Sequence, residues 1–237
     1  MDEHTAKAFD ADLKEISGKI GVMARLIEQQ IASASEILES GDTGLAKRVI
    51  AADNQVDAMQ REIEEKAVIT IARRQPVAVD LREVVGALRI SNDLERIGDL
   101  AENVAKRALL SAQEFRAING VTLQLQHMFE LVLEQLKNVI QAFAAKDTDA
   151  AEEVWRADQE VDALNNSLFR ELLTYMLENP RTITFCTHML FCAKNIERMG
   201  DHATNIAETV YYIVKGTSLP GERPKADVTS LETLPQA

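Results

Sequence analysis

Residues that interrupt regular structure are scarce in this sequence. The 237 residues include only ten Gly and five Pro, and three of the prolines, Pro220, Pro224 and Pro235, lie close to the C-terminal end. So few turn-forming residues exclude a sheet of many short strands and favour long helices. Only two cysteines occur, Cys186 and Cys192. Their number argues against a disulfide framework or a zinc knuckle and predicts two buried thiols.

A long apolar run, of the kind that marks a membrane span or a secretory signal, is also missing. The chain opens with Asp2 and Glu3 close to its start, and no apolar segment follows them, so no secretory signal is expected. The longest weakly charged stretch, residues 182–193, is well short of the ~20 residues that a spanning helix needs. We therefore expect a cytoplasmic protein with no membrane span of its own.

Basic residues are fewer than acidic ones: the chain has 26 Lys and Arg and 38 Asp and Glu, which gives a formal net charge of −12. Such a surface repels the phosphate backbone of nucleic acids, so we expect no nucleic-acid partner. It attracts cations, or proteins with basic patches. Because 46% of the residues are apolar, the chain can still bury a sizeable core.

An internal duplication is the strongest positive feature of the sequence. Two blocks occur in both halves, in the same order: residues 52–59 match 157–164, and residues 94–99 match 196–201. A proline, Pro76 in one half and Pro180 in the other, lies between the two blocks. The shared order predicts one structural unit repeated twice rather than a chance likeness of acidic helices.

Each half is expected to form three long antiparallel helices, because apolar residues recur at steps of three and four. The predicted helices span residues 6–39, 45–74, 77–110, 113–145, 150–178 and 182–215. The predicted fold class is all-α, with two tandem, pseudo-symmetric three-helix bundles in residues 1–111 and 112–215. Residues 216–237, where the apolar periodicity ends, are expected to form a disordered tail.

Both third helices carry a wholly apolar heptad stripe, which we expect to face the other two helices of the same bundle. The stripe of the first half and its counterparts 102 residues later are Ala87, Ile90, Leu94, Ile97, Ala101, Val104, Ala108 and Met189, Cys192, Ile196, Met199, Ala203, Ile206, Val210.

Pairs of acidic residues spaced i,i+4 recur at corresponding places of the two halves. The four pairs are Asp53 and Asp57, Glu95 and Asp99, Asp158 and Asp162, and Glu197 and Asp201. Like charges at this spacing destabilise a helix by about 0.2–0.5 kcal/mol per pair, and a bound cation would reverse that effect. Oxygen ligands favour hard ions such as Mg²⁺, Mn²⁺, Ca²⁺ or iron. The pattern therefore predicts metal binding, with a second helix completing each site.

Two other interpretations of the acidic pairs stay open: each pair could lie on a solvated helix face, or arginines could neutralise it. Arg96 could pair with Asp99 at i,i+3, as Arg198 could with Asp201, and either pair would relieve the repulsion without metal. His202 follows Asp201 directly, but a step of one residue turns it about 100° towards the apolar seam. We therefore expect His202 to lie outside the ligand set.

Two glycines lie in the middle of the third helices, where Gly costs about 1 kcal/mol relative to Ala. They are Gly98 and Gly200, each directly before the second acidic residue of its pair. We interpret them as places where a neighbouring helix or loop approaches closely beside the carboxylates.

Residues 72–82 (ARRQPVAVDLR) and 92–101 (NDLERIGDLA) resemble the signature of the PhoU family, the phosphate-specific transport system accessory proteins, and residues 194–203 carry a weaker copy. The resemblance extends over about residues 6–215. It implies two bundles side by side with multinuclear metal sites on their surface. One site would be built from Asp53, Asp57, Glu95 and Asp99, the other from Asp158, Asp162, Glu197 and Asp201, with iron, manganese, magnesium or zinc as the candidate ions.

The same resemblance implies a non-enzymatic, homodimeric negative regulator of the phosphate-starvation response. Its expected partners are the ATPase subunit of the phosphate ABC transporter and a sensor histidine kinase, which would hold it at the inner membrane while it restrains phosphate uptake. The basic corner Arg73 and Arg74 is our candidate partner-binding site. The second copy departs from the signature, because Asn195 replaces Asp93 and the corner reads ENPR. We expect its metal site to differ from the first.

Two functions of other classes remain as alternatives. A metal store or metalloenzyme of the ferritin-like kind uses Glu-x-x-His motifs on bundle helices, and no His of this chain has Glu three residues before it. An inert helical scaffold would leave the duplicated acidic pairs unexplained. The phosphate-binding and nucleophile motifs GxxxxGK[ST], GxSxG and HExxH are all absent, which favours a regulator that acts by binding.

Overall fold

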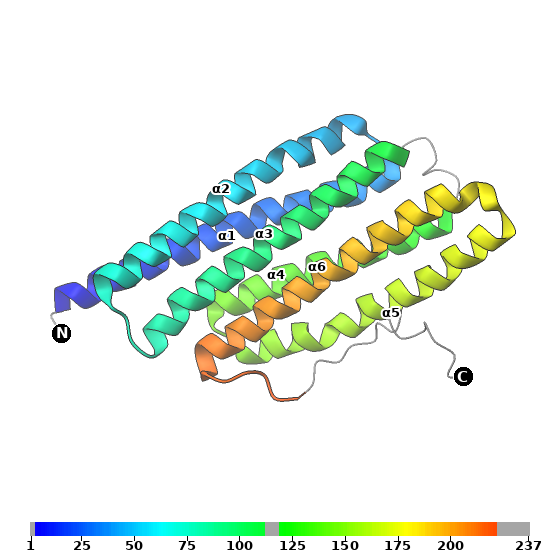
Figure 1. Cartoon of the computed structure of the whole chain (residues 1–237). Helices are drawn as coiled ribbons and strands as arrows, with labels where there is room; N and C mark the ends of the chain where they lie inside the picture. The colour runs from blue at the N-terminus through cyan, green and yellow to red at the C-terminus, as the bar shows by residue number, and fades with distance from the viewer. Residues whose placement is uncertain (1–2, 112–118, 222–237) are drawn as a thin grey trace, which may run out of the picture.

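The structure is a computed structural model that describes residues 3–111 and 119–221, and those residues form six long helices in two antiparallel bundles (Figure 1). The first bundle consists of α1 (Glu3–Ser40), α2 (Thr43–Arg74) and α3 (Val79–Ser111). The second consists of α4 (Asn119–Ala145), α5 (Thr148–Glu178) and α6 (Ile183–Lys215), with a 3₁₀ turn, η2 (Pro180–Thr182), before α6. The predicted all-α class with two tandem three-helix bundles is confirmed. The predicted start of the second repeat at residue 112, and residues 222–237 of the predicted tail, lie outside the described residues.

The second helix of each bundle begins at an aspartate cap, two residues earlier than the sequence predicts. The Asp42 carboxylate accepts hydrogen bonds from the backbone N–H groups of Gly44 (2.7 Å) and Leu45 (3.0 Å). Asp147 caps α5 in the same way. Each cap satisfies N–H groups that lack a partner inside the helix, which extends the helix towards its N-terminus.

The corners between the second and third helices differ between the repeats. Gln75 and Ala78 adopt left-handed backbone angles (φ 49° and 50°) on either side of Pro76, so α3 begins at Val79, later than predicted. In the second bundle the chain re-enters a helix at once through η2, where Pro180 occupies a position that needs no N–H donor.

The predicted heptad stripes form the cores of the bundles. All fourteen of their side chains are buried, which confirms that α3 and α6 turn these faces inwards. Cys186 and Cys192 are buried free thiols as predicted, and burial raises the pKa of Cys192 to about 12. No helix in the described part of the chain is long and apolar enough to cross a membrane.

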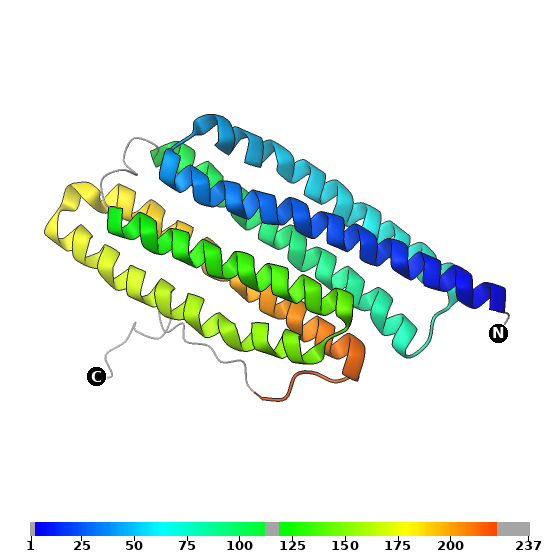
Figure 2. The ribbon, with the colours of Figure 1, turned by 180° about the vertical axis from the view of Figure 1, so that it is seen from behind.

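The two bundles lie side by side, with α3 and α6 adjacent on one face and α1 and α4 on the opposite face (Figures 1 and 2). Helices α2 and α5 lie on the outer edges. Gly86 allows α3 and α6 to approach closely, because a Cβ atom there would lie 2.4 Å from Cδ1 of Ile213. This contact between the repeats is not evident from the sequence pattern of either repeat.

Candidate functional site: two acidic faces

The packing of α2 against α3 brings the predicted carboxylates of the first repeat together. Burial raises the pKa of Asp53 to about 6, and the nearby carboxylates of Glu102, Asp99, Asp57 and Glu95 add to this shift. The pKa of Glu95 is also raised, by burial first and then by Asp99 and Asp57. These carboxylates from two helices therefore form one coupled group, which we call the first acidic face.

Glu102 belongs to the first acidic face but is missing from the predicted set. It lies seven residues, or about two helical turns, after Glu95 and so shares its face of α3. Glu102 is not part of the i,i+4 pairs that both halves share, because its counterpart in the second half is Thr204. The i,i+7 spacing from Glu95 would have identified it.

The second acidic face, between α5 and α6, lies deeper than the first. Asp158, Asp162 and Glu197 are only 1%, 2% and 3% exposed, whereas every carboxylate of the first face is partly exposed. Burial raises the pKa of Glu197 to about 7; a hydrogen bond from Lys194 (2.8 Å) opposes this shift, and the charges of Asp201 and Asp162 add to it. All four predicted residues of this repeat thus lie in one region.

The two mid-helix glycines provide the space for this packing, as the sequence interpretation expected. A Cβ atom on Gly98 would lie 3.5 Å from Oδ1 of Asp53. A Cβ atom on Gly200 would lie only 2.8 Å from Oδ1 of Asp158, closer than such atoms normally approach. Glycine therefore lets a carboxylate of the second helix lie directly against the third helix.

The arginine pairing that was left open as an alternative occurs on the first face. Arg96 lies 3.1 Å from Oδ2 of Asp99 and 3.4 Å from Oε2 of Glu95. Its side chain is 60% exposed, so these ion pairs are weak. They relieve part of the repulsion between the carboxylates of α3, but Asp53 has no cation among the groups that shift its pKa.

His202 joins the two bundles, and it lies close enough to the first acidic face for its charge to oppose the rise that burial causes in the pKa of Glu95. Its Nδ1 lies 2.9 Å from Oδ1 of Asp93 on α3, and the Asn205 amide donates to the same oxygen (3.3 Å). The Asp93 that the second repeat lacks therefore contributes to the contact between α3 and α6.

The two arginines of the predicted basic corner have different surroundings. Arg74 donates from Nε to Oδ2 of Asp12 (3.1 Å) and so attaches the end of α2 to α1. Asp12 also pairs with Lys66 (3.0 Å), and the hydrogen bonds from Lys66 and Arg74 lower its pKa. Arg73 is exposed. Of the two candidates, Arg73 is therefore the more accessible to a partner.

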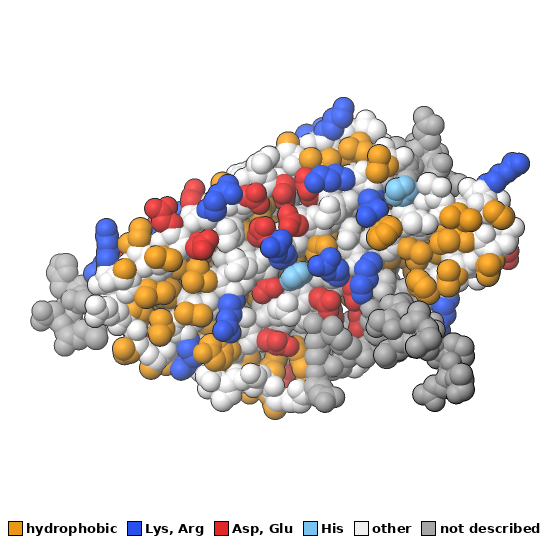
Figure 3. Space-filling model, in the orientation of Figure 1, with side chains coloured by type: hydrophobic (Ala, Val, Ile, Leu, Met, Phe, Trp, Pro, Cys, Tyr) orange, Lys and Arg blue, Asp and Glu red, His pale blue; other side chains and the backbone are white. Residues whose placement is uncertain are grey.

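The donors of both faces suit a hard cation. Across residues 3–111 and 119–221, no three His, Cys, Asp or Glu side chains converge as a preformed metal site. Yet the faces present only oxygen donors from Asp and Glu, and Oδ1 of Asp53 and Oε2 of Glu197 are buried without a hydrogen-bond partner among the described residues. A buried carboxylate oxygen without a partner is costly, and a cation would remove that cost. Figure 3 shows acidic side chains gathered in the middle of the α3–α6 face, with hydrophobic side chains towards both ends.

The fold and these faces define a class of protein: an all-α tandem repeat in which two three-helix bundles each carry an acidic face. The family model described as PhoU domain matches residues 20–108 and 125–210. The chain belongs to the PhoU family.

Named relatives match almost the whole chain. The phosphate-specific transport system accessory protein PhoU homolog of Rhizobium meliloti is 50% identical over 96% of this chain and 95% of its own length. The homolog of the same name in Caulobacter vibrioides is 46% identical over 97% and 100%. The crystal structure of PhoU from Pseudomonas aeruginosa superposes with a TM-score of 0.85 at 39% identity, covering 88% of this chain and 100% of that one. For the phosphate transport system regulatory protein PhoU from Streptococcus pneumoniae the TM-score is 0.83 at 26% identity, covering 89% and 99%.

Proposed function

We propose that this chain is an accessory protein of a phosphate-specific transport system, and that it acts as a metal-binding adaptor rather than by catalysis. Membership of the PhoU family and the names of its relatives support the transport role. The observation that carries the adaptor mechanism is the duplicated clustering of carboxylates across two helices of each repeat.

The eight predicted carboxylates hold the ions in this mechanism. Asp53, Asp57, Glu95 and Asp99, joined by Glu102, serve the first repeat, and Asp158, Asp162, Glu197 and Asp201 serve the second. A bound iron, manganese, magnesium or zinc ion would neutralise the negative charge that remains among these carboxylates. Because each face spans two helices, the carboxylates then couple the occupancy of the site to the geometry between those helices.

The regulatory part of the proposal concerns protein partners. The adaptor would bind the ATPase subunit of the phosphate ABC transporter and a sensor histidine kinase, restraining phosphate uptake when phosphate is plentiful. The exposed Arg73, with the exposed apolar residues Val77 and Val79 beside it, offers a mixed surface of the kind that protein partners bind. We propose that the working unit is a homodimer, held at the membrane through these partners.

Elemental analysis of purified protein tests the metal sites. The variant in which Glu95, Asp99, Glu197 and Asp201 are all replaced by alanine should keep its helical circular dichroism but lose most of the manganese or iron that the unaltered protein binds. A variant with four exposed glutamates elsewhere replaced by alanine, Glu64, Glu65, Glu130 and Glu178, carries the same net charge and should bind metal normally. Equal metal content in all three proteins would eliminate the site assignment.

A reporter for phosphate-starvation genes tests the pathway. A deletion strain should express the reporter even in high phosphate, and the unaltered gene should restore repression. Tagged protein from phosphate-replete cells should co-purify with the transporter ATPase and the kinase, and Arg73→Glu should weaken that recovery. A deletion strain that still represses the reporter in high phosphate would contradict the proposed regulation.

A further inference from the structure

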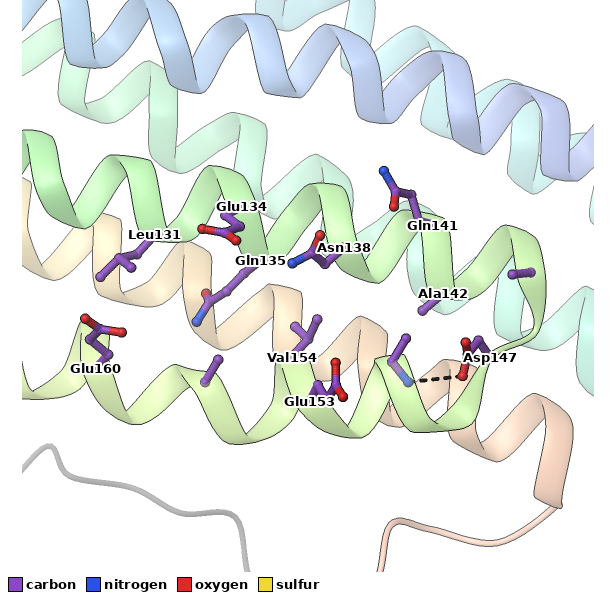
Figure 4. Close-up of a pocket in the computed structure, with 13 residues that line it drawn as sticks. Leu131, Glu134, Gln135, Asn138, Gln141, Ala142, Asp147, Glu153, Val154 and Glu160 are labelled. Atoms are coloured by element: carbon purple, nitrogen blue, oxygen red, sulfur yellow. Dashed lines mark hydrogen bonds between the residues drawn. The ribbon is translucent and has the colours of Figure 1, made fainter.

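Two glutamines are buried at equivalent places in the first helices of the two repeats. Gln30 on α1 is 4% exposed and Gln135 on α4 is 5% exposed. Gln135 lines a groove between α4 and α5, and Gln30 lines the corresponding groove between α1 and α2. Figure 4 shows Gln135 extending from α4 towards α5, whereas Gln141 on the same helix points away from α5.

The amide oxygens of both glutamines lack a partner. Among the described residues, no hydrogen-bond partner reaches Oε1 of Gln30 or Oε1 of Gln135, and Nε2 of Gln30 is likewise unpaired. An unpaired buried amide is rare in folded proteins because it loses its bonds to water without replacement. Its occurrence at the same position in both repeats requires an explanation beyond an accident of packing.

These oxygens lie against the acidic faces. Oε1 of Gln30 and Oδ1 of Asp53 lie 3.2 and 3.5 Å from the point where a Cβ atom of Gly98 would be. In the second repeat, Oε1 of Gln135 and Oδ1 of Asp158 lie 3.1 and 2.8 Å from the equivalent point on Gly200. In each repeat an amide oxygen and a carboxylate oxygen thus converge on one glycine.

We propose that Gln30 and Gln135 are additional metal ligands, each providing its amide oxygen to the ion bound by the carboxylates of its own repeat. The inference rests on the proposed metal binding. Hard cations accept amide carbonyl oxygens together with carboxylates. A neutral oxygen completes a ligand shell without adding repulsion to carboxylates that already raise one another's pKa. Each site then draws ligands from all three helices of its bundle, and the glycine leaves room for the two converging oxygens.

The test compares Mn²⁺ binding, measured by electron paramagnetic resonance of the free ion, with thermal unfolding of the metal-free protein. Gln135→Leu and Gln30→Leu keep most of the side-chain volume but remove the oxygen. Each should weaken Mn²⁺ binding in its own repeat at least tenfold. Losses of that order follow when residues around a metal site are mutated. Neither should lower the melting temperature without metal, because the amide oxygen that each removes has no partner there. Gln141→Leu and Gln29→Leu, which alter exposed glutamines of the same helices, should bind Mn²⁺ like the unaltered protein.

A second substitution separates a ligand from a structural residue. Gln135→Glu keeps an oxygen donor, so it should retain Mn²⁺ binding even if Gln135→Leu destabilises the metal-free protein. The assignment of the glutamines alone would be overturned by either of two results. One is that the leucine variants bind Mn²⁺ as tightly as the unaltered protein. The other is that the glutamate variant binds Mn²⁺ as poorly as the leucine variant. An unaltered protein that binds no Mn²⁺ would overturn both this assignment and the metal-binding part of the proposed function.

Discussion

The two repeats share a framework but differ in how their acidic faces meet water. The first face gathers five partly exposed carboxylates from Asp53 to Glu102, with the exposed Arg96 beside two of them. In the second face Thr204 replaces the fifth carboxylate, and three of the remaining four are almost fully buried. Duplication therefore preserved the positions of the donors, whereas the depth of the site diverged.

This difference in exposure determines how each face limits the repulsion between its carboxylates when no metal is bound. In the first face, exposure to water and Arg96 moderate the repulsion between the carboxylates. In the second, burial is the main cause that raises the pKa of Glu197 to about 7, so the face takes up a proton more readily near neutral pH. We expect the ion of the second face to exchange more slowly, and the stability of that repeat to depend more strongly on its ion.

The largest expected effect is the selective loss of metal from one repeat. Asp158→Asn with Asp162→Asn should abolish binding in the second repeat and leave the first intact. Asp53→Asn with Asp57→Asn should do the reverse, because each pair lies among the carboxylates of its own bundle. Metal per chain and release rates into a chelator provide the measurement.

The protein that keeps only the second face should release its ion more slowly, because its carboxylates are less accessible. If either pair of substitutions removed all the metal, the two faces would form a single cooperative site and the comparison would fail.

The next effect concerns the stability of metal-free protein as a function of pH. Folding raises the pKa of Glu197 from the ordinary glutamate value of 4.5 to about 7. The favourable contribution of this side chain is therefore complete below about pH 4.5 and is lost as the pH rises through about 7. Glu197→Gln stays neutral throughout. It should differ from the unaltered protein by less than about 1 kcal/mol near pH 5 and exceed its stability near pH 8 by on the order of 2–3 kcal/mol.

Glu95→Gln provides the matched comparison in the first face. The pKa of Glu95 is also raised, but the side chain is partly exposed and Arg96 opposes the shift. Its stability gain near pH 8 should therefore be smaller. Thermal unfolding in the presence of a chelator at the two pH values measures both variants, and an equal gain in both would show that burial does not distinguish the faces.

The glycines offer a third contrast. Gly200→Ala should cost about 1–3 kcal/mol, because its Cβ atom would overlap a buried carboxylate oxygen of Asp158. At Gly98 the nearest atom lies at 3.2 Å, and the helix propensity of alanine, worth about 1 kcal/mol, offsets the tighter contact. Gly98→Ala should thus be close to neutral in chemical denaturation, and a larger loss for Gly98→Ala than for Gly200→Ala would reverse our ranking of the two sites.

The sequence predicted the features that depend on local periodicity. The heptad stripes and the break near Pro76 follow from residues that are neighbours along one helix or turn, and the structure confirms them. The close approach at the mid-helix glycines was predictable for a similar reason, since an internal glycine has a local cost that tertiary packing must justify.

The features that the sequence did not predict depend on contacts between helices. Gln30 and Gln135 lie on α1 and α4, which carry none of the four duplicated acidic pairs, and only the packed bundle brings them to the carboxylates. The contact of Asp93 with His202 joins the two repeats, so no pattern within a single repeat reports it. The different depth of the two faces likewise arises from neighbouring side chains rather than from the spacing of the acidic residues themselves.

The smallest expected effect on stability, and the sharpest probe of the first face, is the removal of Arg96. The pairs of Arg96 with Asp99 and Glu95 are exposed, so Arg96→Gln should change the free energy of unfolding by only about 0–1 kcal/mol. The same guanidinium competes with a cation for both carboxylates. Its removal should therefore strengthen metal binding in the first repeat, by up to about fivefold if a full kcal/mol of pairing is released, and leave the second repeat unchanged.

Calorimetric titration with Mn²⁺ at low and moderate salt separates this competition from general charge effects. Arg96 acts at short range, so the gain in affinity should persist at moderate salt, whereas long-range attraction to a more acidic surface would be screened. Arg25→Gln, on the exposed side of α1, alters the net charge equally and serves as the control. If Arg25→Gln strengthened binding as much as Arg96→Gln, the difference between the faces would come from overall charge, and the ion pairs beside Glu95 and Asp99 would have no part in it.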